Sequence, residues 1–213
     1  MNDVEWRTRT DPEPMLNYPR GRASERKLRL YAVARCRSVG HMLRADASWA
    51  AVAAAERYAD GALAEEELRR AYFAASPDAI PGLEWAAHTA AVVAQYTAWT
   101  GDGAAWYAAE RTGFLCHRYL DDPATDRRVF AAAARCVFGD PFRPAVVDRA
   151  WLTADVVALA TGVYEDRAFD RLPILADALQ DAGCEDADIL EHCRQPGPHA
   201  RGCWVADALT GRG

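Results

Sequence analysis

The stretch SWAAVAAAERYADG, residues 48–61, indicates the fold class. Alanine is the best helix former, and five or more alanines in one short run favour a closely packed helix over any strand. Ser48 belongs to the residue types that cap helix N-termini, and Gly61 can adopt the left-handed conformation that ends a helix. The stretch therefore predicts one helix that begins after Ser48 and stops at Gly61.

Helix signals of the same kind recur along the rest of the chain. Ser24 is placed to cap a helix through roughly Leu43, in which Gly40 could introduce a kink or an early end. Pro173 falls early in its helix, as expected for this residue, and no run of alternating β-branched residues predicts a strand. The prediction is an all-α fold without a sheet: a compact multi-helix bundle or a short α-solenoid of about eight to ten helices.

The clearest irregular connector is GDPFRP, residues 139–144, which carries three residues that favour turns. It separates a predicted N-terminal helical region, 1–138, from a predicted C-terminal helical region, 145–213. We expect the two regions to pack together as one domain.

Charge is distributed unevenly along the 213 residues, whose net charge is −6. Residues 1–45 hold ten Arg or Lys against five Asp or Glu. Arg22, Arg26 and Arg29 follow helical spacing and could line one face that binds phosphates or an acidic partner. The favoured alternative is that these arginines pair with acidic groups of the same molecule or of another subunit. Nucleic-acid binding through the basic N-terminal helix thus stays open, but the acidic balance does not favour it.

The C-terminal stretch CEDADILEHCRQPGPHARGCW, residues 184–204, gathers three cysteines and two histidines. Zinc prefers four nitrogen or sulfur ligands, so the stretch suggests a zinc site built on Cys193, His199 and Cys203. Zinc is the one cofactor that the sequence suggests.

Packing is the favoured interpretation of the same stretch. It contains no C-x2-C pair, and the adjacent residues His192 and Cys193 would point about 100° apart on a helix, so they could not easily share one ion. In the packing interpretation the three cysteines are small buried groups, while both histidines cap helix ends or face solvent.

Enzymatic activity has little support in the sequence. Cys203 and His199 are the best local candidates for a thiol and its base, but no recognisable catalytic signature surrounds them. Phosphate-binding, dinucleotide-binding and hydrolase motifs are absent from the sequence.

The N-terminus shows no secretory signal, and no stretch approaches the ~20 apolar residues of a membrane span. We therefore expect a cytoplasmic protein with reduced thiols and no membrane association.

Several segments together resemble a group of uncharacterised bacterial proteins that is multiplied in planctomycete-type genomes. The segments are RKLRLYAVARC, FGDPFRP and RAFDRLPILADALQDAGCEDADILEHCRQPGPHARGCW. The likeness covers roughly residues 1–75 and 135–213. It implies a shared fold and an intracellular setting, and it assigns no catalytic residues.

The leading functional hypothesis from the sequence is a non-enzymatic helical module that binds another protein or a second copy of itself. Such a module would be regulatory or part of a larger assembly. The alternatives are a small zinc-binding or Cys/His-dependent protein and a nucleic-acid-binding protein.

Overall fold

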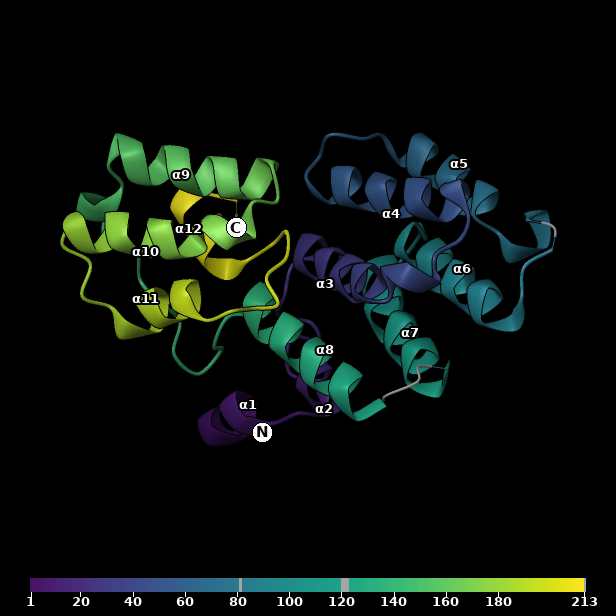
Figure 1. Ribbon diagram of the computed structural model, residues 1–213, viewed down its shortest axis with the longest axis horizontal. Coiled ribbons are helices and arrows are strands. Elements are labelled where there is room, and N and C mark those ends of the chain that lie inside the picture. The colour runs from purple at the N-terminus through teal and green to yellow at the C-terminus, as the bar shows by residue number, and fades with distance from the viewer. Residues whose placement is uncertain (81, 120–122, 213) are drawn as a thin grey trace.

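A computed structural model describes residues 1–80, 82–119 and 123–212, with the side chains of these residues except 85, 86, 112–119 and 123–126. Over the described residues the chain forms twelve α-helices and no strand, which confirms the all-α prediction (Figure 1). The helices are α1 (Asp3–Thr8), α2 (Pro12–Leu16), α3 (Glu25–Ser38), α4 (Asp46–Ala59), α5 (Glu65–Ala74), α6 (Trp85–Thr97), α7 (Ala104–Tyr119), α8 (Pro123–Phe138), α9 (Ala154–Glu165), α10 (Leu172–Asp181), α11 (Ala187–Arg194) and α12 (Trp204–Thr210).

Helix α3 is the centre of the N-terminal region and packs against α4, α6, α7 and α8. It begins as expected, because the Ser24 side chain accepts a hydrogen bond from the amide of Lys27 at 3.3 Å. It ends at Ser38, earlier than Leu43, and Gly40 opens a separate 3-10 turn. The early end agrees with the expected effect of Gly40.

The predicted start of α4, directly after Ser48, lies three residues beyond the observed one. The helix begins at Asp46, with Ala45 at its N-cap, and Ser48 lies inside the first turn. The Ser48 hydroxyl is buried and has no hydrogen-bond partner among the described residues. Gly61 has φ +71°, so its predicted role as the stop of this helix is confirmed.

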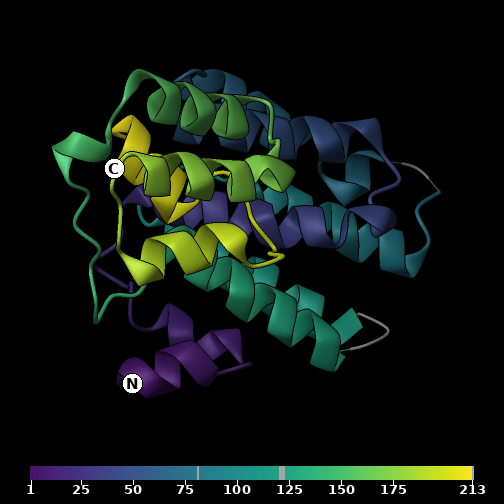
Figure 2. The same cartoon turned by 60° about the vertical axis from the view of Figure 1, so that its left-hand side comes forward.

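The C-terminal region is a separate stack of helices, in which α9, α10 and α11 lie one below another (Figure 2). No helix forms between Phe138 and Arg149, so the connector predicted at 139–144 is irregular in the structure. The apolar core of this region includes Cys136 from α8 together with residues from Val156 to Leu209. Helix α8 therefore contributes to the cores of both regions, because Phe130 and Val137 pack on the N-terminal side.

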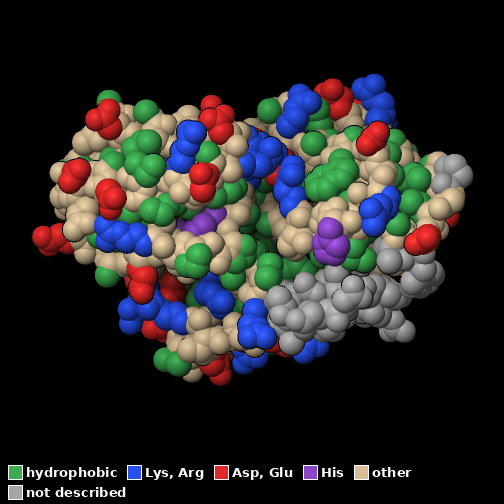
Figure 3. All heavy atoms as spheres, in the orientation of Figure 1, with side chains coloured by type: hydrophobic (Ala, Val, Ile, Leu, Met, Phe, Trp, Pro, Cys, Tyr) green, Lys and Arg blue, Asp and Glu red, His purple; other side chains and the backbone are tan. Residues whose placement is uncertain are grey.

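Charged groups concentrate where the two regions meet. Figure 3 shows Lys and Arg side chains gathered in the notch between the C-terminal helices and the α3–α4 side. Two buried acids lie there: Glu56 on α4 and Asp207 on α12. Arg37 and Arg167 pair with Glu56. No described helix is long and apolar enough to cross a membrane.

Candidate metal centre

Four side chains from separate parts of the chain converge at the junction of the two regions. They are Cys136 in the last turn of α8, His192 on α11, His199 in the loop after α11, and Cys203 at the N-cap of α12. One potential ligand atom from each lies within 4.8 Å of the others. Both sulfurs belong to buried residues, His192 is 6% exposed, and His199 is half-buried. These four residues could hold a metal ion.

Two distances between potential ligand atoms of this cluster lie near those of a tetrahedral site. The Nε2 of His192 lies 3.2 Å from the Sγ of Cys203, and the Nδ1 of His199 lies 3.7 Å from the Sγ of Cys136. Zinc–sulfur bonds of about 2.3 Å and zinc–nitrogen bonds of about 2.0–2.1 Å in a tetrahedron place sulfur and nitrogen about 3.6 Å apart. An ion therefore fits between these atoms without a large rearrangement.

Gln195 orients both histidines from outside the cluster. Its backbone carbonyl lies 3.1 Å from the Nε2 of His199. Because a carbonyl can only accept, Nε2 carries the proton and the lone pair on Nδ1 faces Cys136. The Gln195 side-chain amide lies 3.0 Å from the Nδ1 of His192, and its oxygen can accept from that nitrogen after a half-turn of the amide. Such outer hydrogen bonds are typical of histidines that bind metals.

The two cysteines of the cluster differ in acidity. Contacts with Cys136, His192 and His199 hold the pKa of Cys203 well below its usual value, although burial opposes this. The hydrogen bond with Cys203, together with burial, raises the pKa of Cys136. Burial lowers the pKa of His199, but its hydrogen bonds with Cys203 and the Gln195 carbonyl raise it overall. Cys203 is therefore the more acidic of the two sulfurs.

The loop that carries His199 and Cys203 is shaped by a glycine in the left-handed region. Gly202 has φ +84°, and a Cβ at this position would lie 2.9 Å from the Cδ1 of Leu30. Its carbonyl accepts a hydrogen bond from Lys27 at 2.7 Å, which ties the residue before Cys203 to α3. The approach of this loop to α3 thus depends on the absence of a side chain at position 202.

Replacing Gly202 with alanine should lower the free energy of unfolding by about 1–3 kcal/mol, because the new side chain strains the backbone and contacts Leu30. Thermal unfolding monitored by circular dichroism measures the change. Gly162 is the matched control, since it is helical and a Cβ there meets no atom within 4 Å. The Gly162→Ala variant should be as stable as the natural protein or slightly more stable. Equal stability of the two variants would contradict the argument.

The structure brings together two of the three cysteine and histidine residues that the sequence suggested as ligands. His199 and Cys203 are in the cluster, whereas Cys193 is fully buried in the apolar core beside Cys184 and Ile189. The expectation that both histidines cap helix ends or face solvent is wrong for His192, which is buried against Cys203.

Sequence reasoning missed Cys136 and His192. Ile189 and Cys193 are four residues apart, so both lie on the face of α11 that points to the core. From this spacing, Cys193 could have been predicted as a core residue and His192 as the candidate ligand. Nothing local identified Cys136, which lies on a helix far away in the sequence. Five described cysteines are free thiols; the sixth, Cys116, lies outside the described side chains.

The three arginines expected to form a partner-binding face do not share an exposed surface. Arg26 donates to both carboxylate oxygens of Asp207, at 2.7 and 3.0 Å. Arg29 is 3% exposed and donates to two backbone carbonyls, those of Thr97 and Trp99. Arg22 stays exposed, with its guanidinium 4.6 Å from the centre of the Tyr18 ring. Arg26 and Arg29 thus donate their hydrogen bonds to groups within the molecule.

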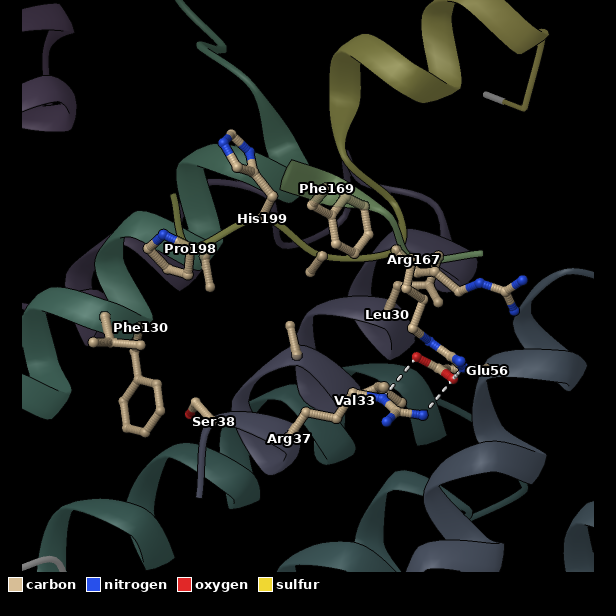
Figure 4. A pocket seen from close by; sticks show the side chains of 15 residues that line it. Leu30, Val33, Arg37, Ser38, Glu56, Phe130, Arg167, Phe169, Pro198 and His199 are labelled. Atoms are coloured by element: carbon tan, nitrogen blue, oxygen red, sulfur yellow. Dashed lines mark hydrogen bonds and ion pairs between the residues drawn. The ribbon is translucent and has the colours of Figure 1, made fainter. Parts of the chain in front are cut away.

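A cavity of about 230 Å³ lies beside the cluster, between the two regions (Figure 4). Pro198 and His199 lie at one end of it, and the ion pair between Arg37 and Glu56 lies at the other. Leu30, Val33 and other apolar side chains of α3 line the space between. The loop that supplies two candidate ligands therefore also forms a wall of the interface between the regions.

The chain matches no family model, no curated protein and no solved structure. The resemblance to planctomycete-type bacterial proteins stays a prediction. The chemistry of the cluster rests on its own geometry.

Proposed function

We propose that this protein binds one zinc ion through Cys136, His192, His199 and Cys203. The observation that carries the proposal is the convergence of four potential ligand atoms within 4.8 Å, from a helix of the N-terminal region and three neighbouring segments of the C-terminal region. The Gln195 carbonyl supports it, because it accepts a hydrogen bond from the Nε2 of His199 and leaves the lone pair of Nδ1 facing Cys136.

The ligand set favours zinc among the common metals. Two thiolates and two imidazoles in a tetrahedron suit zinc, whereas magnesium and calcium prefer oxygen ligands. Two thiolates also cancel the double charge of the ion, so the filled site is neutral and compatible with burial. A reducing compartment such as the cytoplasm would keep both thiols available for the metal.

The role of the ion is structural. Four protein ligands complete a tetrahedral zinc site and leave no position for a reactive water. The ion would join α8 to α11, to the loop 195–203 and to the start of α12. It would therefore fasten the C-terminal region to the helix that contributes to both cores.

The metal content of the purified protein tests this proposal. Protein prepared under reducing conditions with zinc present should retain about one zinc per chain after gel filtration. Cobalt exchanged into the site should give the visible absorption bands of a tetrahedral site with sulfur ligands. Less than about a tenth of an equivalent of zinc, together with no tetrahedral cobalt spectrum, would show that the four side chains only pack against one another.

The other two hypotheses from the sequence stay predictions. A protein-binding module is compatible with a structural zinc ion, since such an ion supplies stability and not activity. Nucleic-acid binding would have to use basic side chains other than Arg26 and Arg29, whose contacts lie within the molecule.

A further inference from the structure

Arg22 keeps its charge free at the surface, unlike Arg26 and Arg29. It lies in the segment between α2 and α3, and its guanidinium is exposed, with no hydrogen bond or ion pair within the described part of the chain. The guanidinium lies over the Tyr18 ring, 4.6 Å from the ring centre. A guanidinium that stacks on a ring through its face keeps the N–H groups along its edge for other partners. Arg22 therefore presents accessible hydrogen-bond donors next to an aromatic side chain.

A cavity of about 520 Å³ adjoins this arginine. It lies between the segment 18–24, the first turn of α3 and the C-terminal end of α8. Arg22 and Tyr18 both line it, so the stacked guanidinium lies at its wall. The volume falls within the usual range of small-molecule pockets, about 300–1,000 Å³.

The walls of this cavity suit an aromatic ring. Tyr18 and Phe138 line it from two different segments, and both are half-buried, so part of each side chain is accessible. Val137 and Pro141 add further apolar surface. The Tyr18 ring is supported by Phe142, whose ring centre lies 4.7 Å away. A wall of supported aromatic side chains favours a flat apolar ligand, because ring faces and edges pack well against one another.

The charges at the cavity favour an anion. Arg22 and Lys27 line it, and the lining includes no acidic residue within the described ranges. The Lys27 ammonium is engaged by Asp207 and by the Gly202 carbonyl, at 2.5 and 2.7 Å, which leaves Arg22 as the free cation. Ser24, the N-cap of α3, also lines the cavity, so the positive end of this 14-residue helix adds to the same field.

We propose that this cavity binds a small aromatic anion, whose ring packs against Tyr18 and Phe138 and whose carboxylate or phosphate pairs with Arg22. Two parallel N–H groups on the edge of a guanidinium match two oxygens of either anionic group. Tyr18 serves both parts of the ligand, since it forms a wall for the ring and supports the guanidinium. The site is separate from the proposed zinc site, because none of the four zinc ligands lines the cavity.

Calorimetric titration with matched probes tests the proposal. Phenylacetate and phenylacetamide share one aromatic ring and differ in charge. At low salt, phenylacetate should bind about three- to tenfold more tightly, because only the carboxylate forms a charged pair with Arg22. Phenyl phosphate identifies the preferred anion: tighter binding than that of phenylacetate assigns the cavity to phosphates, and weaker binding assigns it to carboxylates.

Two arginines of the same segment supply matched variants. Arg22→Gln should reduce the preference for phenylacetate to less than about twofold, and Arg22→Lys should keep part of it, since lysine keeps the charge but lacks the fork. Arg20→Gln is the control and should keep the full preference. It removes the same charge, but Arg20 lies 5.0 Å from the centre of the Trp106 ring and does not line the cavity. Both arginines are exposed, so both variants should fold.

Added salt should shrink the preference for phenylacetate, because it screens accessible charges. Equal affinity of the natural protein for phenylacetate and phenylacetamide, or no binding of either at millimolar concentrations, would overturn the proposal. An equal loss of preference in the Arg20→Gln and Arg22→Gln variants would do the same. Arg22 would then be a surface residue that only stacks on Tyr18.

Discussion

Replacing Cys136 with alanine should abolish zinc binding and lower the free energy of unfolding of the zinc-loaded protein by about 4 kcal/mol or more. The loss of one of four ligands opens the site, and the ion no longer joins α8 to the C-terminal region. For a chain of this size, the melting temperature should fall by about 10 °C. Thermal unfolding and metal analysis of the same sample measure both effects.

Cys193 supplies a matched control for this experiment. It is also a buried cysteine, 0% exposed against 2% for Cys136. Substitution by alanine removes one sulfur atom at either position. The Cys193→Ala variant should keep about one zinc per chain and lose only the packing of one sulfur, about 1–2 kcal/mol. The difference between the two variants therefore isolates the contribution of the ion.

A chelator separates metal binding from packing in both variants. With zinc removed, the Cys136→Ala and Cys193→Ala proteins should lose similar amounts of stability relative to the natural protein. If the gap between them persists in chelator, Cys136 matters through packing alone. Full zinc content in the Cys136 variant would remove this residue from the proposed site.

The all-α fold could be predicted from the sequence because helix signals are local. Ser24 caps the first turn of α3, which directly follows it, and Gly61 ends α4, which directly precedes it. The misplaced start of α4 shows the limit of such signals. Ser48 is a good cap by residue type, but the helix extends to Asp46, and Ser48 is buried inside it.

The candidate metal centre could be predicted only in part because it is not local. His199 and Cys203 are close in the sequence, and the loop between them brings their side chains together. Cys136 reaches them only because α8 packs against α12, and no periodic pattern of either helix specifies that contact. The sequence indicated the element types, whereas the packing of the two regions brought the candidate ligands together.

Replacing Asp207 with asparagine should lower the free energy of unfolding strongly and leave zinc binding unchanged. Asp207 on α12 is 2% exposed and accepts hydrogen bonds from Arg26 of α3, and Lys27 Nζ lies 2.5 Å from its Oδ2. Burial lowers the pKa of Arg26, but the hydrogen bond and charge of Asp207 raise it above its usual value. The carboxylate is therefore the anion that the two partly buried cations share, and Arg26 has a second ion pair with Asp60 at 3.1 Å.

Asparagine keeps the shape of Asp207 but leaves Arg26 and Lys27 facing each other without their shared counter-ion, so the free energy of unfolding should fall by about 3 kcal/mol. The matching fall in melting temperature is about 6–12 °C. Asp177→Asn is the control, because Asp177 pairs with Arg194 on the surface, where an ion pair contributes about 0–1 kcal/mol. Zinc content should stay near one per chain in both variants, since neither residue is a ligand. If Asp207→Asn lowered the free energy of unfolding no more than Asp177→Asn, the ion pairs of Asp207 would not be what stabilises α12 against α3. The proposed zinc ion would then be the main link between the regions.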